Sequence, residues 1–494
     1  MIYFLRRNAG KILLFTLTAF VGGILFAGIR FGGRTPSSSR TRQAQELDQS
    51  ALAAINGKPV NLFKYSQLVR RFVDQVESSG QKIDPYTMSA IEYNALKQTI
   101  EFHLTLLKAK AEKVRASGAE VNAQIDMIAQ NNKISVGDLK DNLARQGIPF
   151  TMFKNSLRDE IIAGKYLREH ENAISITDED IELSLTRLRA AHILIADKED
   201  QVAFIRANQI LEQVKAGADF ASLARQYSSD TYSAKQGGDL GWFAHGTMVP
   251  EFEKAAFSLN PGAVYPELVK TKFGYHIVKL LDFKRQDIPA NIDAATYRKQ
   301  LLERKKTQAI NALLKDVREN ADIQILSESH LAYQLQSEGK YEEAVIKYKK
   351  LVTENPRSYV PVLFIGDLYT RLKKYDEAMA AYKKAEIIQD LNPQMKNSIV
   401  NIARGMAYKQ QGDDAEKQKQ DTIKSKYFNL AGKEFARASE LAGENLMVHQ
   451  ELKNQFEKIK WDKSAREEEK IIDRLMEMQQ EEAKAAKKKA EGNG

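Results

Sequence analysis

Hydrophobic residues form one uninterrupted run near the start of the chain and fall into periodic patterns after it. The run from Ile12 to Ile29 contains no charged residue and follows a short basic segment. These 18 residues can just span a bilayer, so residues 1–33 are predicted to form a membrane anchor. A cleaved signal peptide has the same basic and then apolar pattern and stays open as the alternative. Residues 34–51 are polar and rich in serine and arginine, and they are predicted to form a linker.

Helical spacing of apolar residues dominates residues 52–186. A short strand with an Asn-Gly turn is predicted at Ala53–Val60. From Leu62 to Val76, and again from Met88 to about Glu171, the apolar positions lie along one face of a helix. The segment contains no cluster of catalytic side chains. It is therefore predicted to be an all-α domain, which serves either as a scaffold or as a groove for apolar client segments.

The pattern changes between residues 187 and 284, where strands and helices alternate. Arg189–Ile195 has the composition of a strand, two amphipathic helices follow it, and the glycines of Gly237–Gly241 require a loop. Pro250 favours the start of a further helix, and alternating residues around Phe273 indicate a hairpin. This segment is predicted to be a compact α+β domain with an antiparallel sheet.

Helical patterns return after this domain. Residues 285–326 are predicted to form a helix and a strand that return the chain to the first helical domain, and residues 327–460 contain a repeat. Its marker residues recur at an interval of 34 positions, with Tyr341, Ala344 and Tyr348 followed by Tyr375, Ala378 and Tyr382. The interval resembles the helix pairs of tetratricopeptide repeats, and a third, degenerate copy is expected around Phe435. Residues 461–494 are rich in Glu, Lys and Ala and are predicted to form a charged, solvated helical tail.

Composition and charge exclude several classes of function. With 494 residues, of which 43% are hydrophobic, the chain is expected to fold into several globular domains. Its net charge of +9 comes from mixed lysine and glutamate surfaces without a basic block, so nucleic-acid binding is not predicted. The lack of cysteine excludes disulfides and thiolate chemistry. Because the seven histidines lack ligand spacing and no phosphate-binding loop follows a strand, no metal or cofactor is predicted.

Five ordered sequence blocks between Arg189 and Leu281 carry a family resemblance. They are Ala191–Leu194, Asp219–Ala221 with Tyr227-Ser228, Gly237–Phe243, Met248–Phe252 and Phe273–Ile277. Together they closely resemble the parvulin family of peptidyl-prolyl cis-trans isomerases. The flanking segments resemble SurA- and PpiD-like envelope chaperones in their pattern, with a short motif at Ala54–Gly57, a helical domain before the parvulin unit and a helix after it.

The resemblance implies a substrate pocket and a pair of histidines. The family's proline ring sits against residues that correspond here to Met248 and Phe252, which are four positions apart, with Leu240 as a third wall. His192 and His276 correspond to the family's paired histidines, which lie on neighbouring strands and share hydrogen bonds beneath the amide. In isolation, Met and Phe are more often ordinary core residues, and a histidine on an apolar strand is more often a satisfied core residue than a catalyst.

A polar residue on the loop after Ser229 completes the implied site. Some members of the family carry cysteine at the position of Thr231, and others carry aspartate at the position of Asp230. Since threonine cannot act as a thiolate, Asp230 is predicted to polarise the amide, and an ordinary turn role stays open as the alternative. No cluster of Arg or Lys lies near Asp197 to hold a phosphate, so specificity for phosphorylated Ser/Thr-Pro bonds is not expected.

Two functions stay open from the sequence. The first is a prolyl isomerase and chaperone that assists unfolded or nascent envelope proteins containing Xaa-Pro bonds. The second is a non-catalytic chaperone or assembly scaffold that uses the parvulin fold and the repeats only to bind proteins. The resemblance also implies a single-pass protein of the inner membrane with most of the chain in the periplasm. A protein partner is expected at the repeat region.

Overall fold

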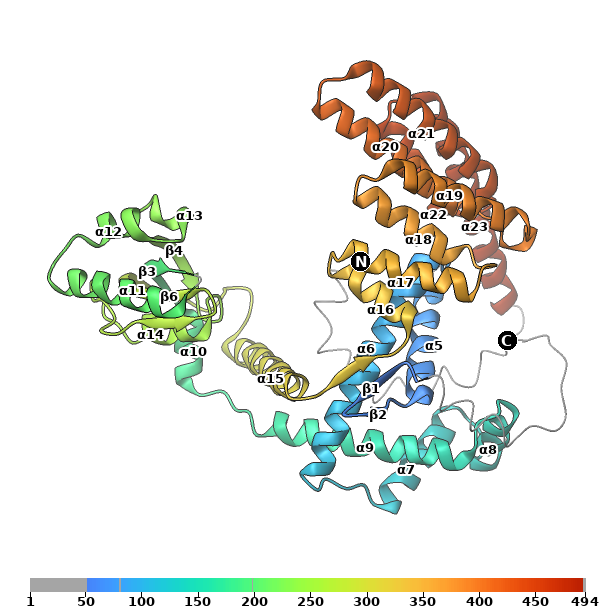
Figure 1. The fold of residues 1–494 in the computed structure, drawn as a ribbon. Coiled ribbons are helices and arrows are strands. Elements are labelled where there is room, and N and C mark those ends of the chain that lie inside the picture. The colour runs from blue at the N-terminus through green and yellow to red at the C-terminus, as the bar shows by residue number, and fades with distance from the viewer. Residues whose placement is uncertain (1–50, 80, 198, 492–494) are drawn as a thin grey trace. The chain divides into compact units, whose positions relative to one another are not determined.

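The computed structural model of the protein describes residues 51–79, 81–197 and 199–491. They form two compact units, which can be followed in Figure 1. One unit contains the described residues up to Tyr166 and those from Leu314 onward, and the other contains Leu167 to Leu313. The chain leaves the first unit within helix α9 (Phe150–Asn172) and returns to it within helix α15 (Ala294–Glu319). The second unit is therefore inserted into the first.

The predicted membrane anchor, residues 1–33, and the predicted linker, residues 34–51 apart from Ala51, lie outside the described residues. Ala51 stands two positions before the first strand. In the part of the chain that the structure describes, no helix combines the length and the apolar character that crossing a membrane requires.

A small antiparallel sheet joins the two separated parts of the first unit. Its strands, in spatial order, are β2 (Lys58–Pro59), β1 (Ala53–Ile55) and β7 (Ile323–Ile325). Asn56 and Gly57 have positive φ angles of 49° and 74°, as the tight hairpin between β1 and β2 requires. Asn56 also holds β7, because its N–H donates to the carbonyl of Asp322 (2.8 Å) and its side-chain oxygen accepts from the N–H of Asp322 (2.9 Å).

Helices make up the rest of the N-terminal part, which is mostly helical as its apolar spacing predicts. They are α5 (Leu62–Ser78), α6 (Pro85–Ala111), α7 (Gly118–Asn131), α8 (Val136–Arg145) and α9. Ser117 and Ser135 each begin a capping box, in which the hydroxyl and a carboxylate three positions later satisfy each other's backbone N–H groups. Leu139, Leu143 and Phe153 are buried in the core that these helices share.

The second unit contains a four-stranded antiparallel sheet, as predicted, with the spatial order β4-β3-β6-β5. Its strands are β3 (Thr186–Ile195), β4 (Asp239–Ala244), β5 (Val269–Thr271) and β6 (Gly274–Arg285). Its helices are α10 (Asp178–Leu185), α11 (Asp200–Lys215), α12 (Phe220–Tyr227), α13 (Thr231–Ala234) and α14 (Pro250–Phe257). Helices α11 and α12 pack on the face that carries Ile193 and Ile277, and α14 packs on the face that carries Val278.

Four helix pairs follow one another at the C-terminal end, coloured yellow to red in Figure 1. They are α16 (Glu328–Ser337) with α17 (Tyr341–Glu354), α18 (Val360–Arg371) with α19 (Tyr375–Asp390), α20 (Ile399–Lys417) with α21 (Asp421–Ala442), and α22 (Leu446–Lys458) with α23 (Asp462–Glu491). Glycines allow close packing within pairs, since a Cβ at Gly366 would lie 2.5 Å from the ring of Tyr382 and one at Gly405 would lie 2.5 Å from that of Phe435. Helices α20 and α21 have 19 and 22 residues, and this length explains why the third copy departs from the regular interval.

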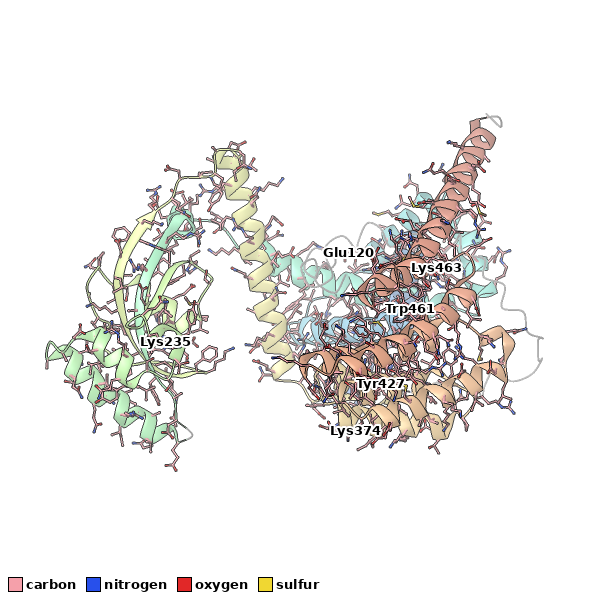
Figure 2. All side chains as sticks on the ribbon, turned by 90° about the horizontal axis from the view of Figure 1, so that it is seen from above. Glu120, Lys235, Lys374, Tyr427, Trp461 and Lys463 are labelled. Carbon is pink, nitrogen blue, oxygen red and sulfur yellow. The ribbon has the colours of Figure 1, made fainter. Side chains whose placement is uncertain are left out.

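The charged C-terminal segment is packed along its first half and is not wholly solvated. Ala465 and Leu475 of α23 are buried. Trp461, labelled in Figure 2, precedes α23 and stacks on Phe456 with 6.1 Å between ring centroids. It also lies so close to Gly432 of α21 that a Cβ there would be 2.3 Å from the indole. Apolar residues at helical spacing inside a highly charged sequence are enough to attach this helix.

Helix α6 packs against the first two helix pairs. The hydroxyl of Tyr86 donates to Oδ2 of Asp367 on α18 (2.6 Å), and the hydroxyl of Tyr382 on α19 donates to Oδ1 (2.7 Å). The ring of Tyr86 meets that of Phe364 edge-on at 5.2 Å between centroids. Burial raises the pKa of Asp367 to about 6, and the two tyrosine hydrogen bonds oppose this shift. The helix pairs are therefore joined to the N-terminal helices through a half-buried carboxyl group.

Protonation of Asp367 is expected to couple the stability of the first unit to pH. Its carboxyl pKa rises from the ordinary 3.8 to about 6 in the folded protein, so the folded state binds the proton more tightly. The free energy of unfolding should therefore fall by on the order of 1 to 3 kcal/mol as pH rises through this window. Asp367→Asn should remove that decrease in denaturant unfolding at acidic and neutral pH. The exposed Asp376→Asn serves as the control, and an unchanged pH dependence in Asp367→Asn would contradict the assignment.

Candidate active site

Two histidines lie next to each other on the sheet of the second unit. The β3–β6 register pairs His192 with Val278 and Leu194 with His276, which makes the histidines diagonal neighbours on one face of the sheet. Their Nδ1 atoms are 3.0 Å apart, and both side chains are buried. The structure thus brings together the two histidines that the sequence resemblance pairs.

A directional chain of hydrogen bonds assigns the protons on both rings. Nε2 of His192 lies 3.0 Å from Oδ2 of Asp230, and because an ionised carboxylate only accepts, this nitrogen carries the proton. Nδ1 of His192 then accepts from Nδ1–H of His276. Nε2 of His276 in turn accepts from the hydroxyl of Thr271 at 2.8 Å. The oxygen of that hydroxyl accepts from the N–H of Phe273 at 3.1 Å, which completes the chain.

Burial keeps both imidazoles neutral at physiological pH. It lowers the pKa of His192 against the opposing influence of Asp230. It also lowers the pKa of His276 to about 4, with neighbouring His192 adding to the shift. Burial acts to raise the pKa of Asp230, but hydrogen bonds from Ser233 and His192 outweigh it and bring the pKa to about 2. The site therefore combines one carboxylate with two uncharged rings.

An apolar wall stands beside the histidines. The ring of Phe252 on α14 is buried, and its centroid lies 5.9 Å from that of His192 and 5.7 Å from that of His276. Leu240 on β4 and Met248, just before α14, are partly buried in the same apolar cluster as Phe252. The side chains predicted for the site thus occur in one region, half of them in the polar chain and half in the adjoining apolar cluster.

Asp230, and not Thr231, faces the histidines. The Asp230 carboxylate accepts from the hydroxyl of Ser233 (2.6 Å) and from the N–H of Tyr232 (3.1 Å), so it also caps the short helix α13. Thr231 is exposed at the first position of that helix, which ends just before Lys235, labelled in Figure 2. The turn role and the contact with the histidines are therefore combined in one carboxylate.

Family models match three regions of the chain. They are the PPIC-type PPIASE domain at residues 179–284, the SurA-like N-terminal domain at residues 1–167 and a tetratricopeptide repeat at residues 363–386. The foldase protein PrsA of Caldanaerobacter subterraneus subsp. tengcongensis is 30% identical over 290 residues, which cover 54% of this chain and 81% of that protein. The chain belongs to the family of PrsA foldases.

Further relatives of this foldase share a smaller part of their length with it. Chaperone SurA of Methylobacillus flagellatus is 30% identical, with 53% of this chain and 64% of that protein covered. Chaperone SurA of Ralstonia nicotianae is 32% identical, with 51% of this chain and 54% of that protein covered. A crystal structure of PrsA from Bacillus anthracis covers 45% of this chain and 95% of its own, at 26% identity and a TM-score of 0.25. The foldase thus spans about half to two thirds of these two SurA proteins.

Glu253 of the foldase orders the turn that carries Met248, a contact that sequence reasoning missed. Its Oε1 accepts from the N–H groups of Thr247 and Met248, each at 2.8 Å, and its Oε2 accepts from that of Gly246 at 2.9 Å. Nδ1 of His245 lies 3.1 Å from the same Oε2, and the glutamate is only 5% exposed. The sequence offers one signal for this contact, an acidic residue on the buried face of an apolar helix. A buried carboxylate needs hydrogen-bond donors, so such a residue indicates nearby N–H groups.

Two hydroxyls and a glycine complete the surroundings of the histidines. Ser233 Oγ lies 3.2 Å from Nε2 of His192, and Thr271 donates to His276. The carbonyl of Gly238 accepts from the N–H of His192 at 2.9 Å, and a Cβ at Gly238 would lie 2.3 Å from the carbonyl oxygen of His192. The glycine loop can therefore lie directly on β3. Serine and threonine are too common for the sequence to predict these partners.

The two histidines are expected to be neutral at physiological pH, with opposite tautomers. Because burial lowers both pKa values, ¹⁵N NMR should show Nε2–H on His192 and Nδ1–H on His276 at neutral pH.

Thr271→Val provides the control, since it removes the donor to Nε2 of His276 and should perturb the His276 resonances most. Imidazolium signals from either ring at neutral pH in the unmodified protein would show that the chain of hydrogen bonds is assigned wrongly.

Proposed function

We propose that this foldase is a peptidyl-prolyl cis-trans isomerase and a chaperone. The observation that carries the proposal is the apolar wall at Phe252 standing against a buried, neutral histidine pair. The proline ring is proposed to bind to Leu240, Met248 and Phe252. The amide is proposed to lie over His192, Asp230 and His276.

The chemistry of isomerisation suits such a site. The barrier of about 18 to 20 kcal/mol is the resonance energy lost when the C–N bond twists, and no bond is broken. An enzyme therefore needs to hold the ring, exclude water that stabilises the planar amide, and bind the twisted state better than either isomer. An apolar wall with few hydrogen-bonding groups meets these needs. Neutral imidazoles also avoid the desolvation that charged rings would impose on this pocket.

Asp230 is proposed to act through its fixed negative charge. Amide resonance places negative charge on the carbonyl oxygen and gives the C–N bond its double-bond character. A carboxylate close to that oxygen disfavours the planar form and thereby lowers the barrier. The low pKa of Asp230, about 2, keeps it ionised throughout the physiological range. Its bonds to Ser233 and His192 hold it in place before the substrate arrives.

The proposed location is the periplasmic face of the inner membrane, with a single pass at residues 1–33. The apolar run of Ile12–Ile29 supports this proposal, together with relatives named as foldases and chaperones. The proposed clients are unfolded or nascent envelope proteins that contain Xaa-Pro bonds. The proposal requires no cofactor, metal or nucleic acid.

A non-catalytic scaffold is the second candidate, and the C-terminal helix pairs favour it. Stacked pairs of this kind offer a concave surface for proteins. In this second candidate function, the parvulin fold binds extended polypeptide segments without accelerating isomerisation. A measurement of prolyl isomerase activity distinguishes the enzyme from the non-catalytic scaffold.

Removing the apolar wall is expected to lower isomerase activity strongly. The purified chain should accelerate cis-to-trans isomerisation of an Xaa-Pro peptide. The Met248→Ala/Phe252→Ala variant should lose at least roughly tenfold in kcat/KM, because the ring loses its binding surface.

The matched control is Met127→Ala/Phe204→Ala, which truncates exposed side chains of the same two types. Circular dichroism reports whether each variant folds, since truncation of buried Phe252 costs about 3 to 5 kcal/mol. If the double variant does not fold, Met248→Ala alone decides. No acceleration by the folded, unmodified chain would favour the scaffold.

Loosening the turn before α14 is expected to weaken substrate binding more than turnover. In Glu253→Gln, the amide NH₂ faces backbone donors, so the turn that carries Met248 loses acceptors. We expect KM for the peptide to rise about three- to tenfold with a smaller change in kcat. Glu251→Gln, at an exposed position of the same helix, is the control. Equal kinetic parameters for Glu253→Gln and the unmodified chain would refute a positioning role.

A further inference from the structure

A cavity of about 260 Å³ lies where α6 meets the first two helix pairs of the C-terminal region. Its walls include the rings of Tyr333, Tyr348 and Phe364, and the side chain of Glu92 reaches it from α6. Ser329 and Asn355 at its edge are exposed, so the cavity opens to solvent. It is smaller than the roughly 300 Å³ at which pockets for drug-sized ligands begin. Its size suits a single side chain.

Glu92 is a carboxylate without a counter-charge in this cavity. Burial raises its pKa, and no cation among the described residues acts to lower it. The described residues that line the cavity include no Lys and no Arg. A carboxylate that is partly removed from water destabilises the fold unless a partner compensates for the lost hydration.

Glu328, Asp367 and His330 already have partners of their own. Glu328 is paired with Lys347 and Lys350 at 3.3 and 2.6 Å. Asp367 accepts from two tyrosine hydroxyls. Both ring nitrogens of His330 are occupied, Nδ1 by Ser327 Oγ at 2.7 Å and Nε2 by the Tyr65 hydroxyl at 3.1 Å. Burial lowers the pKa of His330 to about 4, so it supplies no positive charge at neutral pH.

We propose that this cavity is a binding site for a lysine or arginine side chain of a partner polypeptide. The ammonium or guanidinium group pairs with the carboxylate of Glu92, and the surrounding aromatic rings favour a cation through their π faces. The aliphatic stem of the side chain lies against the rings of Tyr348 and Phe364, which are 5.2 Å apart between centroids.

A polypeptide fits better than a free amine because polar groups continue beyond the cavity. Ser89, Ser329, Asn355 and Ser358 line it together with the aromatic rings. Such groups can bond to the backbone on either side of the inserted side chain. The inference is independent of isomerase activity, because the cavity belongs to the first unit and the candidate active site to the second.

The test is fluorescence anisotropy of the full chain with a labelled Gly/Ser octapeptide that carries one arginine, one lysine or one citrulline at its centre. Citrulline keeps the shape of arginine and removes its charge. We expect the arginine or the lysine peptide to bind at least tenfold more tightly than the citrulline peptide. Glu92→Gln should abolish this preference, and Glu338→Gln, on α16's C-terminal cap and paired with Lys340, should retain it.

A second measurement concerns the unliganded protein. Because no described residue gives Glu92 a counter-charge, Glu92→Gln should melt at the same temperature as the unmodified chain or higher. A lower melting temperature would mean that Glu92 stabilises the fold, and it would overturn the proposal. Equal binding of the citrulline peptide, or an undiminished preference in Glu92→Gln, would also overturn it. Competition by free arginine at the same affinity as the peptide would overturn the assignment to a polypeptide.

Discussion

The pairing of β1 with β7 is the constraint on which the architecture of this foldase depends. It joins Ala53–Ile55 to Ile323–Ile325, and the side chain of Asn56 adds a further bond to Asp322. The entropy of closing a loop grows only slowly with its length, so a few buried strand pairs can close even one this long. The chain between the two strands can then fold separately. The second compact unit, Leu167 to Leu313, lies within this intervening chain and does not interrupt the fold of the first unit.

Within the inserted unit, the four-stranded sheet positions the residues of the candidate site. Antiparallel register places His192 and His276 on the same face as the apolar cluster around Phe252, while the opposite face packs on α11 and α12. In the hydrogen-bond chain from Thr271 to Asp230, each imidazole ring donates one hydrogen bond and accepts one. A site of this kind is arranged by backbone register and by burial, and it requires few charged groups.

The fold and the candidate site could be predicted where the residues involved lie in short, recognisable sequence motifs. Met248 and Phe252 are four positions apart, and the blocks around His192 and His276 are long, so the resemblance assigned them correctly to one region. Thr271 acts through its hydroxyl, which leaves no pattern in a sequence, and Glu253 acts through backbone groups and could be suspected only as an acid on the apolar face of a helix. The attachment of α6 to the helix pairs was equally hidden, because its tyrosines look like ordinary core residues. The buried face of helix α23 was not predicted, because its few apolar residues lie in a highly charged sequence.

The contact between Tyr86 and Asp367 has a consequence for synthesis, because the two residues are 281 positions apart. At translation rates of about 5 to 20 residues per second, the ribosome needs roughly 15 to 55 s to deliver the second after the first. Throughout that interval the aromatic side chains of α6 have no helix pairs to cover them. The nascent chain therefore exposes this face of α6 until α18 has been synthesised.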